Sequence, residues 1–429
     1  MRFTLLIVLL SLFSNISCWA QFSIRDEIRE NPYYSGSNNV VYADSIPVSY
    51  TPVPKGKKAF YISHYGRHGS SFLIHKKYYD LPFSVLLQAQ KENKLSLLGE
   101  STFKKVSILY NESRRRQGEL TPTGIYQSQQ ILRRMFQQYP AIFNGEAHVD
   151  AKSTPVSRCI LSMEYGLLEL IKMNPQLHIQ HNASEKDMYY MNLRDTALYL
   201  HKMNKESKEI YKAFYAKYID YLSPMLSLFN DTAYAKSLDL KSLNEALFEL
   251  ATNAKNSEKG KDIDLFNIYT IDEIYRLWMT DNVWWYLNYG FNPYNGGKQP
   301  FSQRNLLRKI IEQADSCIAL EKPGVTLRYG HDTMILPLVC LMNINGYGQV
   351  IDDMEKLVEQ GWINYHVFPM AANIQFIFYR NNKRDRNVLV KVLLNEKEAT
   401  LPLESKYAPY YRWKDVRKYY LDLLATYAE

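Results

Sequence analysis

The sequence predicts an α/β protein in which a mixed, mostly parallel central sheet is flanked by helices and carries an inserted, mainly helical cap domain. Two observations lead to this prediction. Several segments run from a short apolar stretch through a polar turn into an amphipathic helix, the pattern of a layered α/β domain. Between about 185 and 300 the chain changes to long Tyr-, Leu- and Lys-rich stretches with helical spacing. We therefore expect a core of residues 21–184 and 301–429, and a helical insertion over 185–300.

The first half of the chain contains most of the predicted core elements. Lys58–Tyr65 is rich in β-forming residues and ends at Gly66, which indicates a buried strand leading into a loop. Leu120–Tyr139 opens with Thr-Pro-Thr-Gly and continues with apolar residues three and four apart, which predicts a helix with proline in its first turn. Residues 148–171 repeat the order of strand, polar turn and helix.

The second half completes the predicted sheet. Val325–Tyr329 indicates a strand that turns at Gly330-His331-Asp332 into an apolar segment. Residues 366–380 and 387–395 look like two antiparallel strands, and Lys414–Tyr427 like a final helix. Because parallel strands of such sheets place ligands at their carboxyl ends, the turns that follow them are where a site is expected.

The N-terminus resembles a secretory signal. Arg2, an apolar run from Leu5 to Phe13 and a small residue at Ala20 predict a signal peptide over residues 1–20, and therefore a periplasmic or secreted protein. Lipid anchoring at Cys18 is the weaker alternative, because Asn15-Ile16-Ser17 lacks the leucine-led sequence of such sites. No later segment approaches the roughly 20 apolar residues of a membrane span.

Charge and cysteine content narrow the class of ligand. The formal net charge of +8 is a mild excess that suits a small anionic ester, and the short run Arg114–Arg116 is the densest basic tract, so nucleic acid is not a predicted partner. After the signal, Cys159, Cys317 and Cys340 form a sparse set that allows at most one disulfide and lacks metal-ligand spacing. We expect no metal and no cofactor.

Polar residues at three predicted turns fit phosphoryl transfer when they are taken together. Alone, Arg67-His68-Gly69 is more often a hydrogen-bonded histidine in a turn. Phosphoryl transfer to an imidazole needs a neutral ring nitrogen, cationic donors for the phosphate oxygens and an acid for the leaving group. His68 can attack, while Arg67 and Arg158 offer planar sets of N–H donors. Protonated His331 adds a donor, and Asp332 is the candidate acid.

The order of these motifs resembles the acid phosphatase branch of the histidine phosphatase superfamily, which includes histidine acid phosphatases, phytases and multiple inositol polyphosphate phosphatases. The matching stretches, in the order of that family, are Arg67-His68-Gly69, Leu120-Thr121-Pro122-Thr123-Gly124, Ser153-Thr154 with Arg158, His331-Asp332-Thr333, and Pro369-Met370 with Asn373. The resemblance implies a metal-independent phosphomonoesterase acting on a small phosphate ester, with a phosphohistidine at His68. It also implies phosphate binding by Arg67, Arg158 and His331, and proton transfer by Asp332.

One position departs from the family pattern. Where the family carries a second arginine, two residues after the glycine, this chain has Ser71, and Leu73 stands where a proline is frequent. Losing one charge-assisted donor costs about 3 kcal/mol of transition-state binding unless another cation replaces it. Four cations are candidates for that replacement: Lys76, Lys77, Lys186 and Arg194.

Two alternative functions remain at this stage. A catalytically weak or inactive protein of the same fold that binds phosphate esters is motivated by Ser71, although such a protein has no chemical reason to keep Asp332 beside His331. Transfer of phosphate between metabolites, as in mutase relatives, is less favoured because a signal peptide removes the protein from cytoplasmic intermediates.

Overall fold

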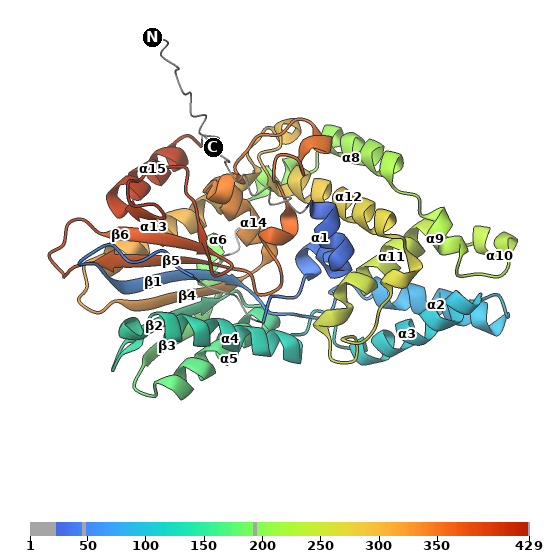
Figure 1. Ribbon diagram of the computed structural model, residues 1–429, viewed down its shortest axis with the longest axis horizontal. Coiled ribbons are helices and arrows are strands. Elements are labelled where there is room, and N and C mark those ends of the chain that lie inside the picture. Colours follow the sequence, from blue (N-terminus) through green and yellow to red (C-terminus); the bar gives the residue numbers. More distant parts are fainter. Residues whose placement is uncertain (1–22, 45–48, 192–194, 428–429) are drawn as a thin grey trace, which may run out of the picture.

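The computed structural model of the protein describes residues 23–44, 49–191 and 195–427, and within them eight strands form one sheet (Figure 1). The strands are β1 (Lys58–Arg67), β2 (His148–Ser153), β3 (His178–Ala183), β4 (Gly324–Gly330), β5 (Asn373–Arg380), β6 (Leu389–Leu394), β7 (Lys397–Ala399) and β8 (Tyr410–Arg412). Their order is β3-β2-β4-β1-β5-β6-β7, with β8 paired to β6.

The sheet has a parallel half and an antiparallel half. Strands β3, β2, β4 and β1 run parallel, whereas β5, β6, β7 and β8 pair antiparallel. In the parallel half Arg67 lies opposite Gly330, and Ser153 opposite Tyr329, so the carboxyl ends of β1, β2 and β4 are level. The predicted fold class is confirmed, and so is the antiparallel pair near the end of the chain that extends the sheet, which is β5 with β6.

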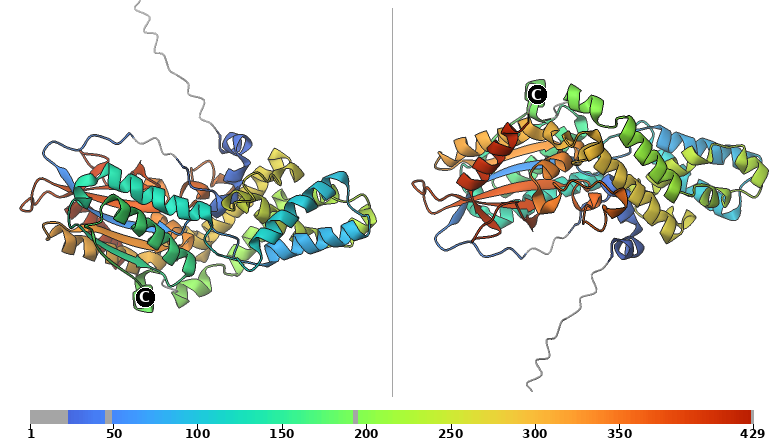
Figure 2. Two further views of the ribbon diagram at one scale, coloured as in Figure 1. Left: turned by 90° about the horizontal axis from the view of Figure 1, so that it is seen from below. Right: turned by 90° about the horizontal axis from the view of Figure 1, so that it is seen from above.

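Helices cover both faces of the sheet because their apolar stripes pack against it. The helices are α4 (Pro122–Gln138), α5 (Ser157–Met173), α13 (Arg304–Ile318), α14 (Asp332–Leu341) and α15 (Trp413–Ala425). Helices α4 and α5 lie on one face, and α13 and α15 on the other (Figure 2). Leu132 and Leu167 pack into the cluster on the first face, and Ile310 and Val416 into the cluster on the second.

The remaining helices are α1 (Ile24–Glu30), α2 (Lys77–Lys91), α3 (Leu97–Ser113), α6 (Met188–Met191), α7 (Thr196–His201), α8 (Lys205–Tyr218), α9 (Leu222–Leu226), α10 (Thr232–Lys236), α11 (Leu240–Asn253) and α12 (Ile271–Tyr289). We call α2, α3, α9, α10 and α11 the helical lobe, which projects from one end of the sheet (Figure 1). A separate hydrophobic cluster, which includes Leu86, Val106 and Leu247, holds the lobe together.

Packing in the helical region joins helices from inside and outside residues 185–300. Helices α2 and α3 lie in the segment predicted as core, yet they pack with α11 in the lobe. Conversely, Leu198 and Val283 lie within 185–300 and belong to the cluster of the sheet. An amphipathic pattern shows that a helix buries one face but not which partner covers it, so the 185–300 insertion stays a prediction about domain boundaries.

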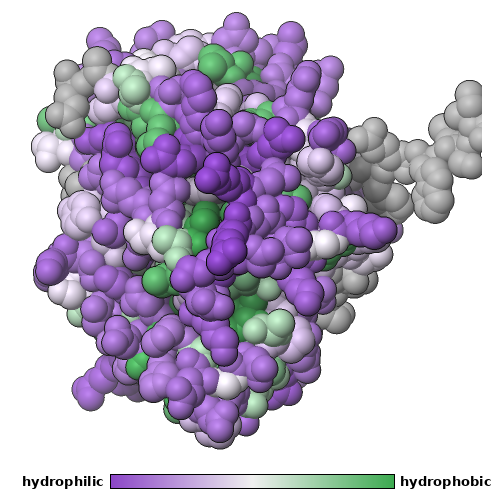
Figure 3. Space-filling view, turned by 90° about the vertical axis from the view of Figure 1, so that its left-hand side faces the viewer, coloured by the Kyte–Doolittle hydropathy of each residue, from purple (hydrophilic) through white to green (hydrophobic). Residues whose placement is uncertain are grey.

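The predicted signal peptide, with Cys18, lies outside the described residues. Within the part of the chain that the structure describes, no helix is long and apolar enough to cross a membrane. The face at the end of the sheet farthest from the helical lobe is mainly hydrophilic, with scattered hydrophobic residues (Figure 3).

Candidate active site

The level strand ends bring the predicted residues together. His68 follows β1, His331 and Asp332 follow β4 and open α14, and Arg158 lies in the first turn of α5. The rings of His68 and His331 have centroids 5.9 Å apart, and the Arg67 guanidinium lies 3.0 Å from the Asp332 carboxylate. Arg158 is close enough to lower the pKa of both histidines, after the larger effect of burial. The N-termini of α5 and α14 add partial positive charge at this edge.

His68 is buried and held in one tautomer. Its Nδ1–H donates to the carbonyl oxygen of Gly69 at 2.8 Å, which leaves Nε2 with a free lone pair. Burial and the charges of Arg67 and Arg158 hold the pKa of this imidazole well below its usual value. The ring is therefore neutral at neutral pH, as a nucleophile toward phosphorus must be.

The loop that carries His68 rests on the start of α4. A Cβ atom at Gly69 would lie 2.4 Å from the carbonyl oxygen of Gly124, so the two backbones touch where neither residue has a side chain. Thr121 caps α4 and donates its hydroxyl to the Ser70 carbonyl at 3.1 Å, and Gln127 accepts from the Ser70 amide at 2.8 Å. The Thr-Pro-Thr-Gly motif is thus the support of the histidine loop.

The two arginines differ in how far their donors are engaged. Arg67 donates to the carbonyls of Asn38 and Phe368 and pairs with Asp332. The Arg158 guanidinium has no hydrogen-bond or ion-pair partner among the described residues, and its buried Nε is unsatisfied. Arg158 as a whole is only partly buried, so its outer N–H groups remain available, and a bound phosphate would supply the anionic partner that the guanidinium lacks.

His331 is neutral in the free protein rather than cationic. Burial, followed by the charge of Arg158, lowers its pKa to about 4. Its Nε2 lies 3.2 Å from the hydroxyl of Thr154, and the buried Cys159 thiol contacts the ring at 3.8 Å. The protonated donor expected from the sequence would therefore form only in acid or against a bound anion, whereas a neutral ring still offers one N–H.

Asp332 is ionised in the free protein. Burial raises the pKa of this carboxyl, but Arg67 and a hydrogen bond from Asn38 outweigh it and lower the pKa below its usual range. The Asn38 amide donates to Oδ2 at 2.9 Å, and the Thr333 amide to Oδ1 at 2.7 Å. A phosphate dianion that draws on the charge of Arg67 would raise this pKa again.

None of the cations considered for the place of the missing arginine is shown to reach the site. Ser71 is buried, and its carbonyl accepts from Asn253 at 3.3 Å. Lys76 pairs with Asp80, and Lys77 lies over the Tyr78 ring. Lys186 is exposed, and Arg194 lies outside the described residues.

Lys202, which follows α7, is a cation near Asp332 that sequence analysis missed. Its Nζ lies 3.6 Å from the centroid of the Tyr289 ring, and among the described residues no carboxylate is within ion-pair distance of it. Burial lowers its pKa to about 8, while the Asp332 carboxylate opposes that shift. Asn38 is the second residue that the sequence did not indicate, since a lone asparagine before the first strand carries no motif.

His64 on β1 is a structural histidine. It is buried, and its Nδ1 has no hydrogen-bond partner among the described residues. Burial and the charge of Arg328 lower its pKa to about 3. Cys159, Cys317 and Cys340 are all free thiols. In the described ranges, no group of three His, Cys, Asp or Glu side chains is arranged to hold a metal ion.

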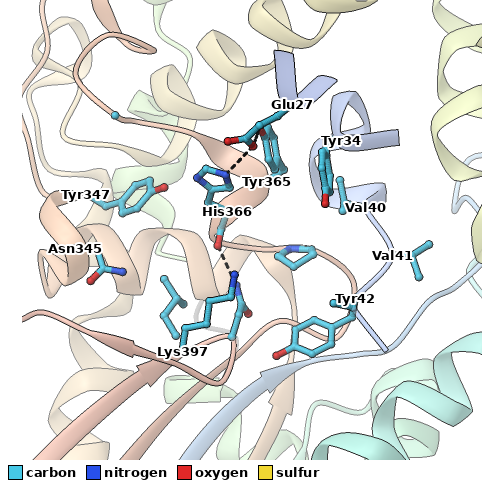
Figure 4. A pocket seen from close by; sticks show the side chains of 15 residues that line it. Glu27, Tyr34, Val40, Val41, Tyr42, Asn345, Tyr347, Tyr365, His366 and Lys397 are labelled. Carbon is cyan, nitrogen blue, oxygen red and sulfur yellow. Dashed lines mark hydrogen bonds and ion pairs between the residues drawn. The ribbon is translucent and has the colours of Figure 1, made fainter. Parts of the chain in front are cut away.

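A separate cavity of about 620 Å³ lies between α1, the chain that follows it, the segment 345–369 and the β6–β7 hairpin (Figure 4). None of the predicted site residues lines it. His366 reaches toward Glu27 at 3.4 Å, and the Tyr34 and Tyr365 rings are stacked with centroids 5.3 Å apart. These contacts hold the N-terminal segment against the 3₁₀ turn Asn364–His366.

The fold and this site together define an α/β protein with a neutral histidine, two arginines and an aspartate at the carboxyl edge of its parallel strands. The family model of the histidine phosphatase superfamily (branch 2) matches residues 67–395. The chain therefore belongs to branch 2 of the histidine phosphatase superfamily, a family of phosphatases, and the resemblance of the motifs is confirmed.

Individual proteins are similar to this chain in sequence or in fold. The chain is 23% identical over 336 residues to multiple inositol polyphosphate phosphatase 1 of Gallus gallus, covering 71% of this chain and 69% of that protein. Its fold is similar to that of the multiple inositol polyphosphate phosphatase of Bifidobacterium longum in complex with inositol hexasulfate, with a TM-score of 0.71, 16% identity, and coverage of 90% and 96% of the two chains. The phytase of D. castellii has a TM-score of 0.64 and 14% identity, with coverage of 92% and 85%.

Proposed function

We propose that the protein hydrolyses phosphomonoesters through a phosphohistidine at His68. The observation that carries this proposal is the state of the His68 ring, which is neutral with Nδ1 engaged by Gly69 and Nε2 free of hydrogen bonds to the described residues. Next to it stands Arg158, a cation without an anionic partner in the described chain. A phosphate group bound there would contact both the nucleophilic Nε2 of His68 and the positive charge of Arg158.

The reaction has two steps that balance in atoms and charge. In the first, Nε2 of His68 forms a bond to phosphorus, the ester bond breaks, and the leaving oxygen takes a proton from Asp332. In the second, Asp332 takes a proton from water, the water oxygen attacks phosphorus, and the phosphorus–nitrogen bond breaks to release phosphate. Arg67 and Arg158 hold the phosphate oxygens throughout, and the neutral His331 donates an N–H.

Inositol polyphosphates are the proposed substrate class, and the proposed location is the periplasm or the exterior of the cell. The named relatives from Gallus gallus and Bifidobacterium longum support the first part. Lys202, a cation beside the site, provides charge for a second phosphate of such a substrate. The signal-like first twenty residues support the second part. The chemistry requires no metal ion at any step.

The test measures phosphate release from an aryl phosphate and from inositol hexakisphosphate, from acidic to neutral pH with EDTA present. Wild type and His68→Ala are compared, and a phosphorylated histidine is sought by mass spectrometry after an alkaline quench. We expect activity that survives EDTA and falls at least 1000-fold in the variant. Full activity in His68→Ala, or inhibition by EDTA, would contradict the mechanism.

A phosphate-ester-binding protein without useful turnover is the second candidate, and Ser71 in place of arginine favours it. In that case the wild type binds inositol hexakisphosphate tightly in calorimetry but releases no phosphate. Turnover of any phosphomonoester that depends on His68 removes this candidate.

A further inference from the structure

Asn38 connects two residues of the site from a segment that precedes the matched part of the family. It lies in a 3₁₀ segment, Pro32–Asn39, whereas the family model begins at residue 67. Its side-chain amide donates to Asp332 Oδ2 at 2.9 Å, and its carbonyl accepts from the Arg67 guanidinium. One residue therefore contacts both partners of the Arg67–Asp332 ion pair.

The neighbouring residue, Ser37, anchors this contact. It has φ of 50°, a left-handed conformation that non-glycine residues rarely adopt. Its hydroxyl donates to Asp281 on α12, and Asn364 donates to both Ser37 and Asp281, at 2.7 and 3.2 Å. These bonds hold the turn in a conformation that the isolated segment would avoid, and so they fix the direction in which Asn38 presents its carbonyl and amide.

The same segment also reaches the loop of the nucleophile. Asn256 donates to the carbonyl of Asn39 at 2.7 Å and accepts from the Ser70 hydroxyl at 2.6 Å. All of these polar groups are buried, and such networks are rigid when each member is satisfied. The segment is thus bonded to the sheet edge on both sides of His68.

We propose that Asn38 is the positioning residue of the general acid: its amide fixes the Asp332 carboxylate, and its carbonyl holds Arg67 beside it. This inference rests on the proposed phosphatase function. Asp332 must give a proton in the first step and accept one in the second, and the donated N–H stabilises the ionised form more than the protonated one. Asn38 therefore sets the balance between the two steps.

Several titratable groups surround Asp332, and the Asn38 variants leave all of them in place. These groups are Arg67, His68 and Tyr65 around β1, His331 in the same turn, Cys159 on α5, Lys202 after α7 and Tyr289 on α12. A change in the titration of Asp332 in Asn38→Ala is then due to the lost amide.

The test uses Asn38→Ala and the nearly isosteric Asn38→Asp in the full chain. The first removes the N–H donor, and the second places another carboxyl against Asp332, so the pair titrates together. We expect the alkaline limb of kcat on an alkyl phosphate to move to higher pH, by about 1 unit in Asn38→Ala and further in Asn38→Asp. On an aryl phosphate, whose leaving group needs little protonation, kcat is expected to change much less.

Asn39→Ala is the matched control, since Asn39 is the buried neighbour whose amide donates to Glu249 at 3.1 Å instead. It costs stability in the same segment but is expected to leave the pH limb in place. A limb that stays fixed in both Asn38 variants, or one that moves equally in Asn39→Ala, would overturn the proposal. Failure of the proposed function looks different, because wild type then releases no phosphate.

Proton uptake on binding inorganic phosphate gives a readout that does not depend on turnover. It is measured by calorimetry in buffers of different ionisation enthalpy. Wild type is expected to take up protons on binding near the acidic end of the range, and Asn38→Ala to do so at higher pH. Identical uptake profiles in the two proteins would contradict the role of Asn38 even if both proved inactive.

Discussion

The two sides of the active site are built in different ways. On the sheet side, Arg67, His68, His331 and Asp332 occupy contiguous turns at strand ends that the parallel register holds level. On the opposite side, Asn38 and Lys202 are single polar residues in irregular segments, each placed by contacts with helices distant in the sequence. In the proposed mechanism, the residues on the sheet side make and break bonds. Asn38 adjusts the protonation of Asp332, and Lys202 influences which substrate is preferred.

The strongest way to test this division is to remove the acid of the sheet side. Asp332→Ala is expected to lower kcat about 1000-fold on an alkyl phosphate, because no other carboxyl replaces the proton donor, but to have a much smaller effect on an aryl phosphate. Steady-state kinetics with both esters measures the ratio. An equal loss on both esters would mean that Asp332 acts by holding Arg67 rather than as an acid.

Removing the cation of α5 is the next largest change. Arg158→Met is expected to lower kcat/KM about 100-fold on every phosphomonoester and to weaken binding of inorganic phosphate, because the charged N–H donors of one guanidinium are lost. Arg308→Met on α13 removes an exposed arginine and serves as the control. A loss of activity confined to polyphosphorylated substrates would mean that Arg158 selects the substrate and does not contribute to catalysis on every ester.

The same comparison explains what the sequence could predict. The strand-turn-helix units are local, so their patterns indicated β1, β2 and β4 and the residues that follow them. Lys202 and Asn38 depend on how α7 and the N-terminal segment pack, which no local pattern encodes. The grouping of α2 and α3 with α11 was missed for the same reason, since an amphipathic helix does not specify its partner. The neutral state of His331 follows from burial, which only the fold reveals.

A substitution of Lys202 tests whether the residues outside the sheet influence substrate preference. Lys202→Met keeps the length of the side chain against Tyr289 but removes the charge, so kcat/KM for inositol hexakisphosphate is expected to fall about tenfold, while that for an aryl phosphate changes less than twofold. Lys205→Met, at the exposed start of α8, is the control. The difference between substrates is expected to shrink at high salt. Equal losses on both substrates would make Lys202 part of the catalytic side.

The smallest expected effect on activity is that of His64, a structural histidine outside the proposed catalytic set, whose effect is on stability. Folding lowers the pKa of His64 to about 3 through burial and the nearby Arg328. Between about 6.5 and that value the unfolded chain binds more protons at this position, so stability falls as pH falls, by at most about 1.4 kcal/mol per pH unit. His64→Leu removes this contribution and flattens the dependence of the urea midpoint on pH, whereas His75→Leu, which replaces an exposed histidine, leaves it unchanged.

Bound phosphate then distinguishes the three buried histidines. An anion in the site favours the protonated forms of His68 and His331, so phosphate is expected to reduce their part of the acid destabilisation in wild type and His64→Leu alike. It does not act on the part due to His64, which lies within β1, four residues before His68. The contrary outcome is that phosphate abolishes the difference in pH dependence of the urea midpoint between wild type and His64→Leu. That result would mean that the protonation of His64 responds to the ligand, and that His64 belongs to the site rather than to the structural part of β1.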